Sequence, residues 1–249
     1  MANPKRTSSK KIKIVLFFII NTLIVCGIYL LLKLDTFNLV DVEIIGTERY
    51  EKPEILSALN LKKGENIFLN YINMNKGEIK ELPYLENIIV EFSSYNTLKI
   101  STSERISKYV AFNKEKNEYY RIDFNGYILE KISNEDRTKT ELLTYGIGFD
   151  DEVTLGIKLN EIYVSKFKVY EEIASCLIEN DIKDNITLVN FENSLTTITL
   201  NDKLNIIFPN DDNLKYKVDT LKEILKNLGE DAKGTLDLTI TNPIFSTDY

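Results

Sequence analysis

The sequence predicts an α+β protein that consists of a single N-terminal transmembrane helix, a small β-α-α-β-β domain and a larger mixed-sheet β domain with two longer helices. An uncharged apolar run near the N-terminus predicts the first part. Segments of alternating polarity predict the strands, and apolar residues at helical spacing predict the helices. The expected parts are a basic tail at residues 1–13, the transmembrane helix at 14–33, the small domain at 36–107 and the β domain at 108–249.

The apolar run, IVLFFIINTLIVCGIYLLL at residues 14–32, is nineteen residues long, and a helix needs about 20 apolar residues to cross a bilayer. A cleaved signal peptide is the alternative, but its apolar region has about 7 to 15 residues and precedes a cleavage site of small residues. This run is longer and ends in YLLLKLD, which favours an uncleaved anchor. Basic residues stay on the cytoplasmic side, so we expect the N-terminus inside and the bulk of the chain outside the cell membrane. The basic residues before the span are Lys5, Arg6, Lys10, Lys11 and Lys13.

Composition excludes several functions. The first 33 residues hold six basic and no acidic groups, which leaves 25 basic and 38 acidic groups beyond the span. Such a negative exterior repels phosphate backbones, so we expect no nucleic-acid partner. The chain has no histidine, which removes the Ser-His-Asp and Cys-His arrangements and the usual zinc ligands. Cys26 lies in the span and Cys176 on a predicted helix, so no disulfide within the chain is expected.

The small domain starts with a strand at residues 40–44, which alternates and stops at a glycine. Pro53 suits the first turn of a helix that follows. A second helix is predicted at 73–82, where a proline comes next. Two alternating runs at 88–92 and 98–102 predict a pair of strands, with SSYN as the turn between them.

The β domain opens with the short strands YVAF, EYYRI and YILEKI, separated by the turns NKEKN and DFNG. One apolar stripe predicts a long helix at residues 160–180. Strands resume at ITLVNFE, LTTITL and LNIIF, and a helix follows that Asp211 or Asp212 can cap and that Gly229 ends. The last predicted strand, TLDLTIT at 235–241, has nothing long after it to cover its outer edge.

Catalytic constellations are not found in the sequence. The acids of FDDE at residues 149–152 are adjacent and point apart, whereas a calcium loop needs acids at alternating positions. Ser165 and Lys168 satisfy S-x-x-K, but the S-D-N and K-T-G partner motifs of wall enzymes are missing. Phosphate-binding glycine loops are also missing. The sequence therefore predicts no catalytic residue, cofactor, metal or small-molecule substrate, and it favours a function based on protein contacts.

The order of several segments is similar to that of a known family. After the basic tail and span come VDVEIIG, KKGENIF, IKELPYLENIIVEF, LKISTSER, YVAF, YYRIDFNGYIL, TITLNDKLNIIF, KYKVDTLKEILKNL and TLDLTIT. Together they resemble the FtsQ/DivIB family of bacterial cell-division proteins over essentially the whole chain, and the small domain resembles a POTRA domain of the FtsQ type. The chain departs from the family pattern in ERISKYVAF and SSYN, which lack a proline, and at Thr239, where the family often has arginine.

The resemblance implies a non-enzymatic scaffold of the divisome that spans the membrane once and links early and late division proteins at the septum. Implied partners are single-span coiled-coil proteins of the FtsB/DivIC and FtsL kinds, with the septal peptidoglycan synthase reached indirectly. In the family the partner adds a strand to the edge of the last strand, and an exposed edge is a template for such addition. The implied partner-binding residues are Thr239, Ile240, Thr241, Asn242 and Phe245.

Alternatives remain open from the sequence. The exterior could be a membrane-anchored binding or sensor module, or a wall-modifying enzyme. A different POTRA protein with several such domains and a barrel needs a longer chain than 249 residues. At the site itself, the alternative is that Ile240 belongs only to the core and that the chain covers its own edge.

Overall fold

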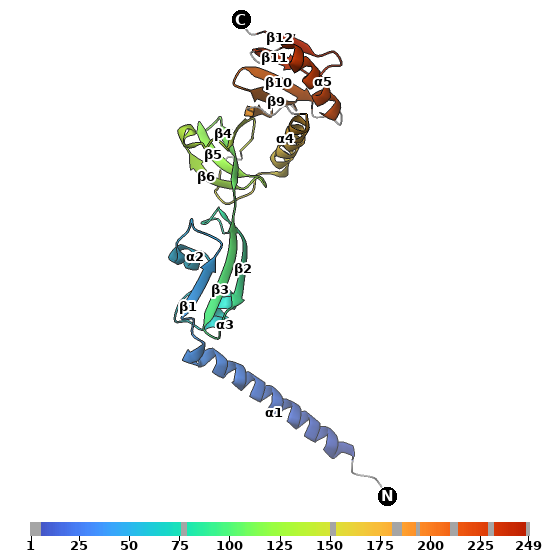
Figure 1. Ribbon diagram of the computed structural model, residues 1–249. Helices are drawn as coiled ribbons and strands as arrows, with labels where there is room; N and C mark the ends of the chain where they lie inside the picture. Colours follow the sequence, from blue (N-terminus) through green and yellow to red (C-terminus); the bar gives the residue numbers. More distant parts are fainter. Residues whose placement is uncertain are drawn as a thin grey trace. The chain divides into compact units, whose positions relative to one another are not determined.

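The computed structural model describes residues 6–75, 79–149, 153–180, 186–192, 195–209, 214–228 and 232–247. The chain divides into two compact units, Met1–Glu104 and Arg105–Tyr249. Each unit has its own cluster of buried apolar side chains. Helices and strands occur in both units (Figure 1), so the predicted α+β class is confirmed.

A long apolar helix opens the first unit. It is α1 (Arg6–Lys33), and its stretch Ile12–Lys33 is long and apolar enough to cross a membrane. The 3₁₀ helix η1 (Asp35–Phe37) follows almost immediately, with only Leu34 between the two helices. The helix that the sequence predicts as a membrane span is therefore present, and little chain separates it from the folded domain.

The rest of the first unit has the predicted β-α-α-β-β order. Its three strands form a sheet of order β1-β3-β2, in which β1 is parallel and β2 antiparallel to β3. Both helices contribute to the same core cluster as the strands, so they pack on one face of the sheet. The elements are β1 (Asp41–Ile45), α2 (Lys52–Ala58), α3 (Ile67–Asn73), β2 (Leu85–Phe92) and β3 (Thr97–Glu104).

Local hydrogen bonds determine where these helices begin. At α2, the side chains of Glu51 and Glu54 form a capping box. At α3, the side-chain oxygen of Asn66 accepts hydrogen bonds from Phe68 N at 3.0 Å and from Leu69 N at 3.4 Å. Such caps satisfy backbone donors that the first helical turn leaves unpaired.

The second helix lies earlier than the predicted range of 73–82. α3 ends at Asn73, and residues 76–78 lie outside the described part of the chain. Ile79 and Leu82, whose spacing favoured a helix, are buried from a turn in which Leu82 N donates to Ile79 O at 3.1 Å. Burial in the core therefore accounts for this apolar pair, while the cap at the start of α3 decides where the helix forms.

The second unit is built on one mixed sheet of order β12-β11-β10-β9-β8-β7-β4-β5-β6. Three neighbouring pairs are parallel, namely β4 with β7, β7 with β8 and β10 with β11, and the other pairs are antiparallel. The strands are β4 (Ser107–Asn113), β5 (Glu118–Asp123), β6 (Ile128–Ile132), β7 (Leu142–Tyr145), β8 (Ile186–Asn190), β9 (Leu195–Leu200), β10 (Leu204–Pro209), β11 (Gly234–Asp237) and β12 (Ile244–Ser246).

Two longer helices pack on this sheet, as predicted. They are α4 (Glu161–Glu179) and α5 (Leu214–Leu228), and a 3₁₀ helix, η2 (Asn134–Asp136), precedes β7. Phe167 of α4 is almost fully buried and stacks on Tyr109 of β4, with ring centroids 4.4 Å apart. The residues expected to bound α5, Asp211, Asp212 and Gly229, lie outside the described residues.

Candidate functional site

The last predicted strand is divided in two by a turn. We expect one strand at 235–241, but β11 ends at Asp237, and β12 returns antiparallel to it with Leu236 opposite Phe245. Asp237 accounts for the break, because its Oδ1 accepts hydrogen bonds from Thr239 N at 2.8 Å and from Thr239 Oγ1 at 2.6 Å. The prediction that the outer edge of β11 is uncovered was therefore wrong, since β12 covers it.

The structure brings the five predicted partner-binding residues together on this hairpin. Thr239, Ile240, Thr241 and Asn242 form the bend between the strands, and Phe245 lies on β12. Ile240 is 41% exposed, so it does not belong only to the core. The backbone oxygen of Ile240 accepts a hydrogen bond from Lys217 Nζ of α5 at 3.1 Å, which holds the bend near that helix.

β12 is the terminal strand at one end of the nine-stranded sheet (Figure 1). Ile244 is 58% exposed, whereas Phe245 packs against the core of the unit. Within the described ranges, no further strand pairs with the outer side of β12. A terminal strand of this kind presents backbone N–H and C=O groups that the sheet itself leaves unpaired.

The opposite end of the same sheet, β6, is partly closed by the chain. Gly156 N donates to Ile128 O at 2.7 Å, and Ile128 N donates to Ile157 O at 3.1 Å. A single antiparallel bridge between Tyr127 and Lys158 continues this contact. A partner strand therefore meets backbone that is already hydrogen-bonded at the start of β6, but not at β12 as far as the chain is described.

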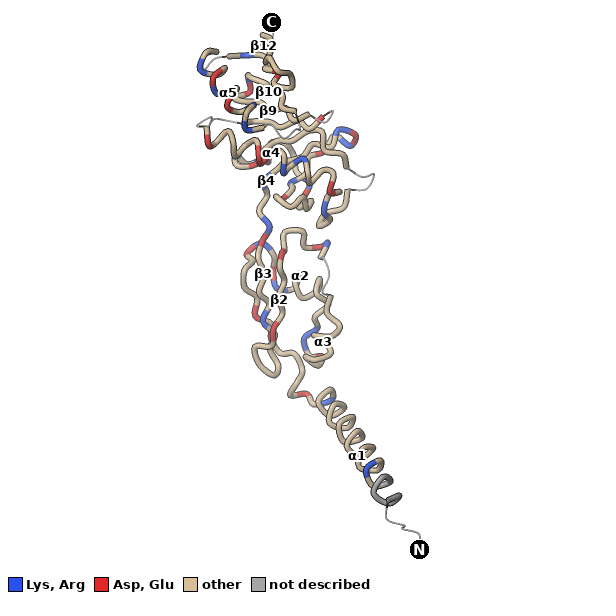
Figure 2. The backbone as a smooth tube through the Cα atoms, turned by 90° about the vertical axis from the view of Figure 1, so that its right-hand side faces the viewer, with Lys and Arg blue, Asp and Glu red and all other residues tan. Residues whose placement is uncertain are grey.

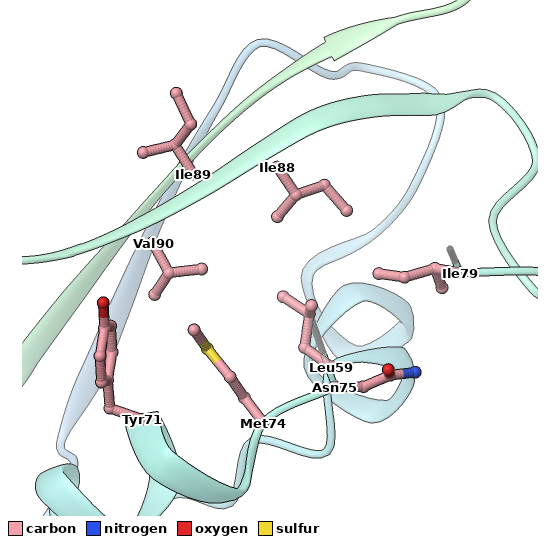
Figure 3. Close-up of a pocket in the computed structure, with 8 residues that line it drawn as sticks. All are labelled: Leu59, Tyr71, Met74, Asn75, Ile79, Ile88, Ile89 and Val90. Carbon is pink, nitrogen blue, oxygen red and sulfur yellow. The ribbon is translucent and has the colours of Figure 1, made fainter. Parts of the chain in front are cut away.

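A second candidate surface lies in the first unit. A pocket of about 300 Å³ opens between α3 and β2, and Figure 3 shows the side chains of both elements that face it. β2 is an edge strand of its sheet, and Ile89 on it is 56% exposed. The pocket is lined by Leu59, Tyr71, Met74, Asn75, Ile79, Ile88, Ile89 and Val90. Its lining offers apolar contacts and no ionisable group other than the Tyr71 phenol.

Among the residues that the structure describes, the candidate catalytic groups are not assembled into a site. Ser165 Oγ donates to Ile162 O of its own helix at 2.7 Å, and Lys168 is exposed. Burial raises the pKa of the Cys176 thiol, which makes it a poorer nucleophile. Among the described residues, no group of three or more possible ligands could hold a metal. Asp150, Asp151 and Glu152 of the FDDE segment lie outside those residues.

An ionic cluster lies in the part of the sheet that contains β4, β5 and β6. Arg121 Nε is 2.6 Å from Glu141 Oε1, and the Arg121 guanidinium also pairs with Glu130. Burial acts to raise the pKa of Glu141, but hydrogen bonds from Ser107 Oγ and Thr138 N, together with Arg121, hold that pKa below its ordinary value. These groups satisfy one another, so the cluster stabilises the fold and leaves no charge free for catalysis.

β12 is the edge strand that the sequence reasoning missed. Its three strand residues, Ile244–Ser246, are too few to show alternation. A usable signal was the dipeptide Asn242-Pro243, since Asn-Pro favours a turn rather than a strand end.

The first unit and the chain as a whole are similar to known proteins. Residues 37–105 match the POTRA domain of the FtsQ type. The chain is 27% identical over 224 residues to the cell division protein DivIB of Clostridium acetobutylicum, covering 87% of this chain and 86% of that protein. It is 28% identical over 191 residues to the DivIB of Clostridium tetani, covering 76% and 70%. It is also 30% identical over 95 residues to the cell division protein FtsQ of Rickettsia bellii, covering 38% and 35%.

An apolar N-terminal helix, an FtsQ-type POTRA domain and a mixed-sheet domain together define a class of membrane-anchored proteins. Within this class, the FtsQ-type POTRA domain and the similarity to two DivIB proteins over most of the chain support the assignment to the FtsQ/DivIB family that the sequence resemblance implied. It is a membrane protein with a role in cell division. The names of its relatives state that role and no enzymatic activity.

Proposed function

We propose that this protein is a non-enzymatic scaffold of the divisome, which links early and late division proteins at the septum by accepting a strand from a partner at β12. The observation that carries the proposal is the position of β12 at the open end of a nine-stranded sheet. Strand addition gains affinity from main-chain hydrogen bonds, and neighbouring side chains give specificity.

The hairpin offers the side chains that such a contact needs. Ile244 presents an exposed apolar group on the edge strand, and Ile240 presents another on the bend. The family's frequent arginine is absent at Thr239, but Lys217 of α5 brings a positive charge to the same bend through its bond to Ile240 O. A lysine lacks the planar fork of arginine, so the partner contact here relies less on a bidentate ion pair.

The partners that fit this role are single-span coiled-coil proteins of the FtsB/DivIC and FtsL kinds, which in turn reach the septal peptidoglycan synthase. The basic residues before the apolar run at 14–32 favour a cytoplasmic N-terminus, with the tail at residues 1–13 inside. In that orientation the POTRA domain at 36–107 and the β domain at 108–249 both face the outside, where the exterior parts of such partners lie.

The test is replacement in living cells. A fluorescently tagged protein with Ile244→Pro is made the only copy, because proline disturbs the pairing of Ile244 with Asp237 of β11 and so distorts the edge strand. Ile244→Asp tests the side chain in the same position, and Ile178→Asp, on an exposed position of α4, is the matched control. We expect filamentous cells that lack later division proteins at the septum for both Ile244 variants, and normal division for Ile178→Asp.

Circular dichroism of the purified exterior and immunoblotting confirm that each variant folds and accumulates. If both Ile244 variants accumulate and the cells divide normally, the partner does not use this edge. In that case the proposal fails at β12, and the pocket between α3 and β2 becomes the surface to change.

A further inference from the structure

We propose that the end of the POTRA domain next to α1 is a membrane-docking face, which rests on the lipid surface around the point where α1 leaves the bilayer. The face consists of exposed apolar side chains on either side of η1, on α3, and at the end of β2 and in the turn after it. We propose that it contacts lipid rather than protein. This inference does not depend on the partner proposed at β12. The residues of this membrane-docking face are Leu34, Val40, Leu69, Ile72, Phe92 and Tyr95.

One hydrogen bond fixes the depth of this face. The Nδ2 of Asn66 donates to the backbone oxygen of Leu31, within the last turn of α1, at 2.9 Å. The apolar run at 14–32 spans about 28 Å at about 1.5 Å per residue, close to the thickness of about 30 Å of the hydrocarbon core. The Leu31 oxygen therefore lies at the border of the hydrocarbon, and Asn66 lies at the depth of the lipid headgroups.

Asn66 is itself held firmly in the domain. Its side chain is 5% exposed, and its Oδ1 caps α3 by accepting from Phe68 N and Leu69 N. The first turn of α3 is consequently at headgroup depth as well. Leu69 lies one turn from the cap and is 39% exposed. At this depth its side chain faces either the lipid interface or water.

Packing extends the face from α3 to the two strands. A row of aromatic rings joins η1, α3 and β2, with centroid distances of 5.6 Å for Phe37 and Phe68, 5.8 Å for Phe68 and Phe92, and 4.9 Å for Phe92 and Tyr71. Val40 N donates to Asn96 O at 2.9 Å, which brings the turn between β2 and β3 to the same end. Tyr95, at the tip of this turn, is 60% exposed.

Charge at this end of the domain does little to oppose lipid contact. The turn at residues 93–96 carries no charged side chain, as Figure 2 shows. Two nearby lysines are paired, Lys62 with Glu65 at 3.4 Å and Lys63 with Asp41 at 3.1 Å. An exposed acid at this end, Asp35 of η1, accepts a hydrogen bond from Asn38 Nδ2 at 3.1 Å.

Because α1 anchors the domain, a small apolar face is sufficient for docking to the membrane. α1 already holds the domain at the membrane, so docking is an intramolecular step at high effective concentration. Exposed apolar and aromatic side chains then bind at the interface without a charged lipid, and tyrosine is enriched at that depth. Docking restrains the orientation of the POTRA domain to the bilayer, which keeps the pocket between α3 and β2 close to the surface from which single-span proteins emerge.

The chain contains no tryptophan, so a single introduced tryptophan reports on one position. The full-length protein is reconstituted into nanodiscs of phosphatidylethanolamine and phosphatidylglycerol, with and without bromine on the upper part of the acyl chains. Tyr95→Trp and Leu69→Trp probe the membrane-docking face. Tyr29→Trp in α1 is the positive control, and Ile106→Trp, 82% exposed and two residues beyond the end of β3, is the negative control.

We expect brominated lipid to quench the tryptophan of the Tyr95→Trp and Leu69→Trp variants by about twofold, with blue-shifted emission and weaker quenching by iodide than in Ile106→Trp. Leu69→Asp in the Tyr95→Trp background should restore access of iodide to the reporter. The proposal is overturned if both face reporters behave like the Ile106→Trp reporter in folded protein. It is also overturned if their protection appears only when two copies share a nanodisc, because the face then binds a second chain.

Discussion

The two ends of the nine-stranded sheet differ in how their edge strands are treated. At β6 the chain returns, and residues 156–158 bond to the start of the strand. At β12 nothing within the described residues covers the outer side. Proteins generally protect edge strands because an open edge pairs with other chains. The difference leaves β12 as the end of the sheet at which an added strand would meet unpaired backbone groups.

Each end also depends on one glycine, which makes the comparison testable. Gly234 begins β11 with φ +138°, and a Cβ there would lie 2.1 Å from Ser246 O of β12. Gly126 precedes β6 with φ +87°, and a Cβ there would lie 2.7 Å from Val164 Cγ2. The first obstacle is backbone and the second is a side chain that can shift.

The largest effect is expected for Gly234→Ala. Strain at this φ and the contact with the Ser246 backbone together should lower the free energy of unfolding by about 3 kcal/mol. β12 should detach first, so hydrogen exchange at Ile244–Ser246 should quicken more than exchange at β10. Unchanged protection of β12, with urea unfolding like that of the parent, would show that β12 does not depend on this close approach.

Glu141→Gln comes next, with an expected loss of about 2 kcal/mol, because Arg121 keeps Glu130 but loses a buried carboxylate. The pKa of Glu141 is lowered in the folded protein. Its contribution is therefore complete above the unfolded pKa of about 4.3 and is lost as the pH falls from there through the folded pKa. Urea unfolding at pH 7 and below pH 4 should show the parent losing more stability than the variant; parallel losses would contradict this assignment.

Gly126→Ala should cost about 1 to 2 kcal/mol, less than the change at Gly234, since the Val164 side chain can move. Gly126 O accepts from Leu159 N at 2.8 Å, so this change should also loosen the segment that covers β6. Thermal unfolding combined with proteolysis at residues 156–158 measures both effects. A larger loss of stability than that of Gly234→Ala would contradict the expectation that the β12 end is the more sensitive of the two.

The smallest effect on stability is expected for Ile244→Lys. The side chain is exposed, so the free energy of unfolding should change by no more than about 0.5 kcal/mol. Binding of the partner's exterior segment, measured by calorimetry, should nevertheless fall more than tenfold, while Ile178→Lys leaves it unchanged. Equal affinity of the Ile244→Lys and Ile178→Lys variants for the partner would show that the open edge does not bind it.

Much of the fold could be predicted because its signals are local. The nineteen apolar residues at 14–32, the alternation in VDVEI and LKIST and the stripe of α4 each depend on near neighbours in the chain. The family resemblance rested on the order of such segments. The ends of helices were predicted less accurately. The helix expected at 73–82 forms instead at Ile67–Asn73, because the side chain of Asn66 caps its start. The apolar pair that favoured the later range is buried in the core from a turn.

The candidate site could be predicted only in part. The five residues from Thr239 to Phe245 do lie on one hairpin, but the exposed edge belongs to β12 and not to β11. Three strand residues carry too little periodicity to be recognised, and the pairing that makes β12 an edge is a property of the whole sheet. The closure of β6 by residues 156–158 is equally non-local.

The sequence by itself determined the membrane helix, the order of the elements and the absence of histidine-based catalysis, because hydropathy, alternation and composition are written in adjacent residues. Only the tertiary structure decided which strand lies at the end of the sheet and which end of the POTRA domain lies next to α1. Those properties depend on hydrogen bonds between distant residues, such as Asn66 with Leu31, and on pairings such as Leu236 opposite Phe245. No pattern along the chain specifies such pairs before the core has packed.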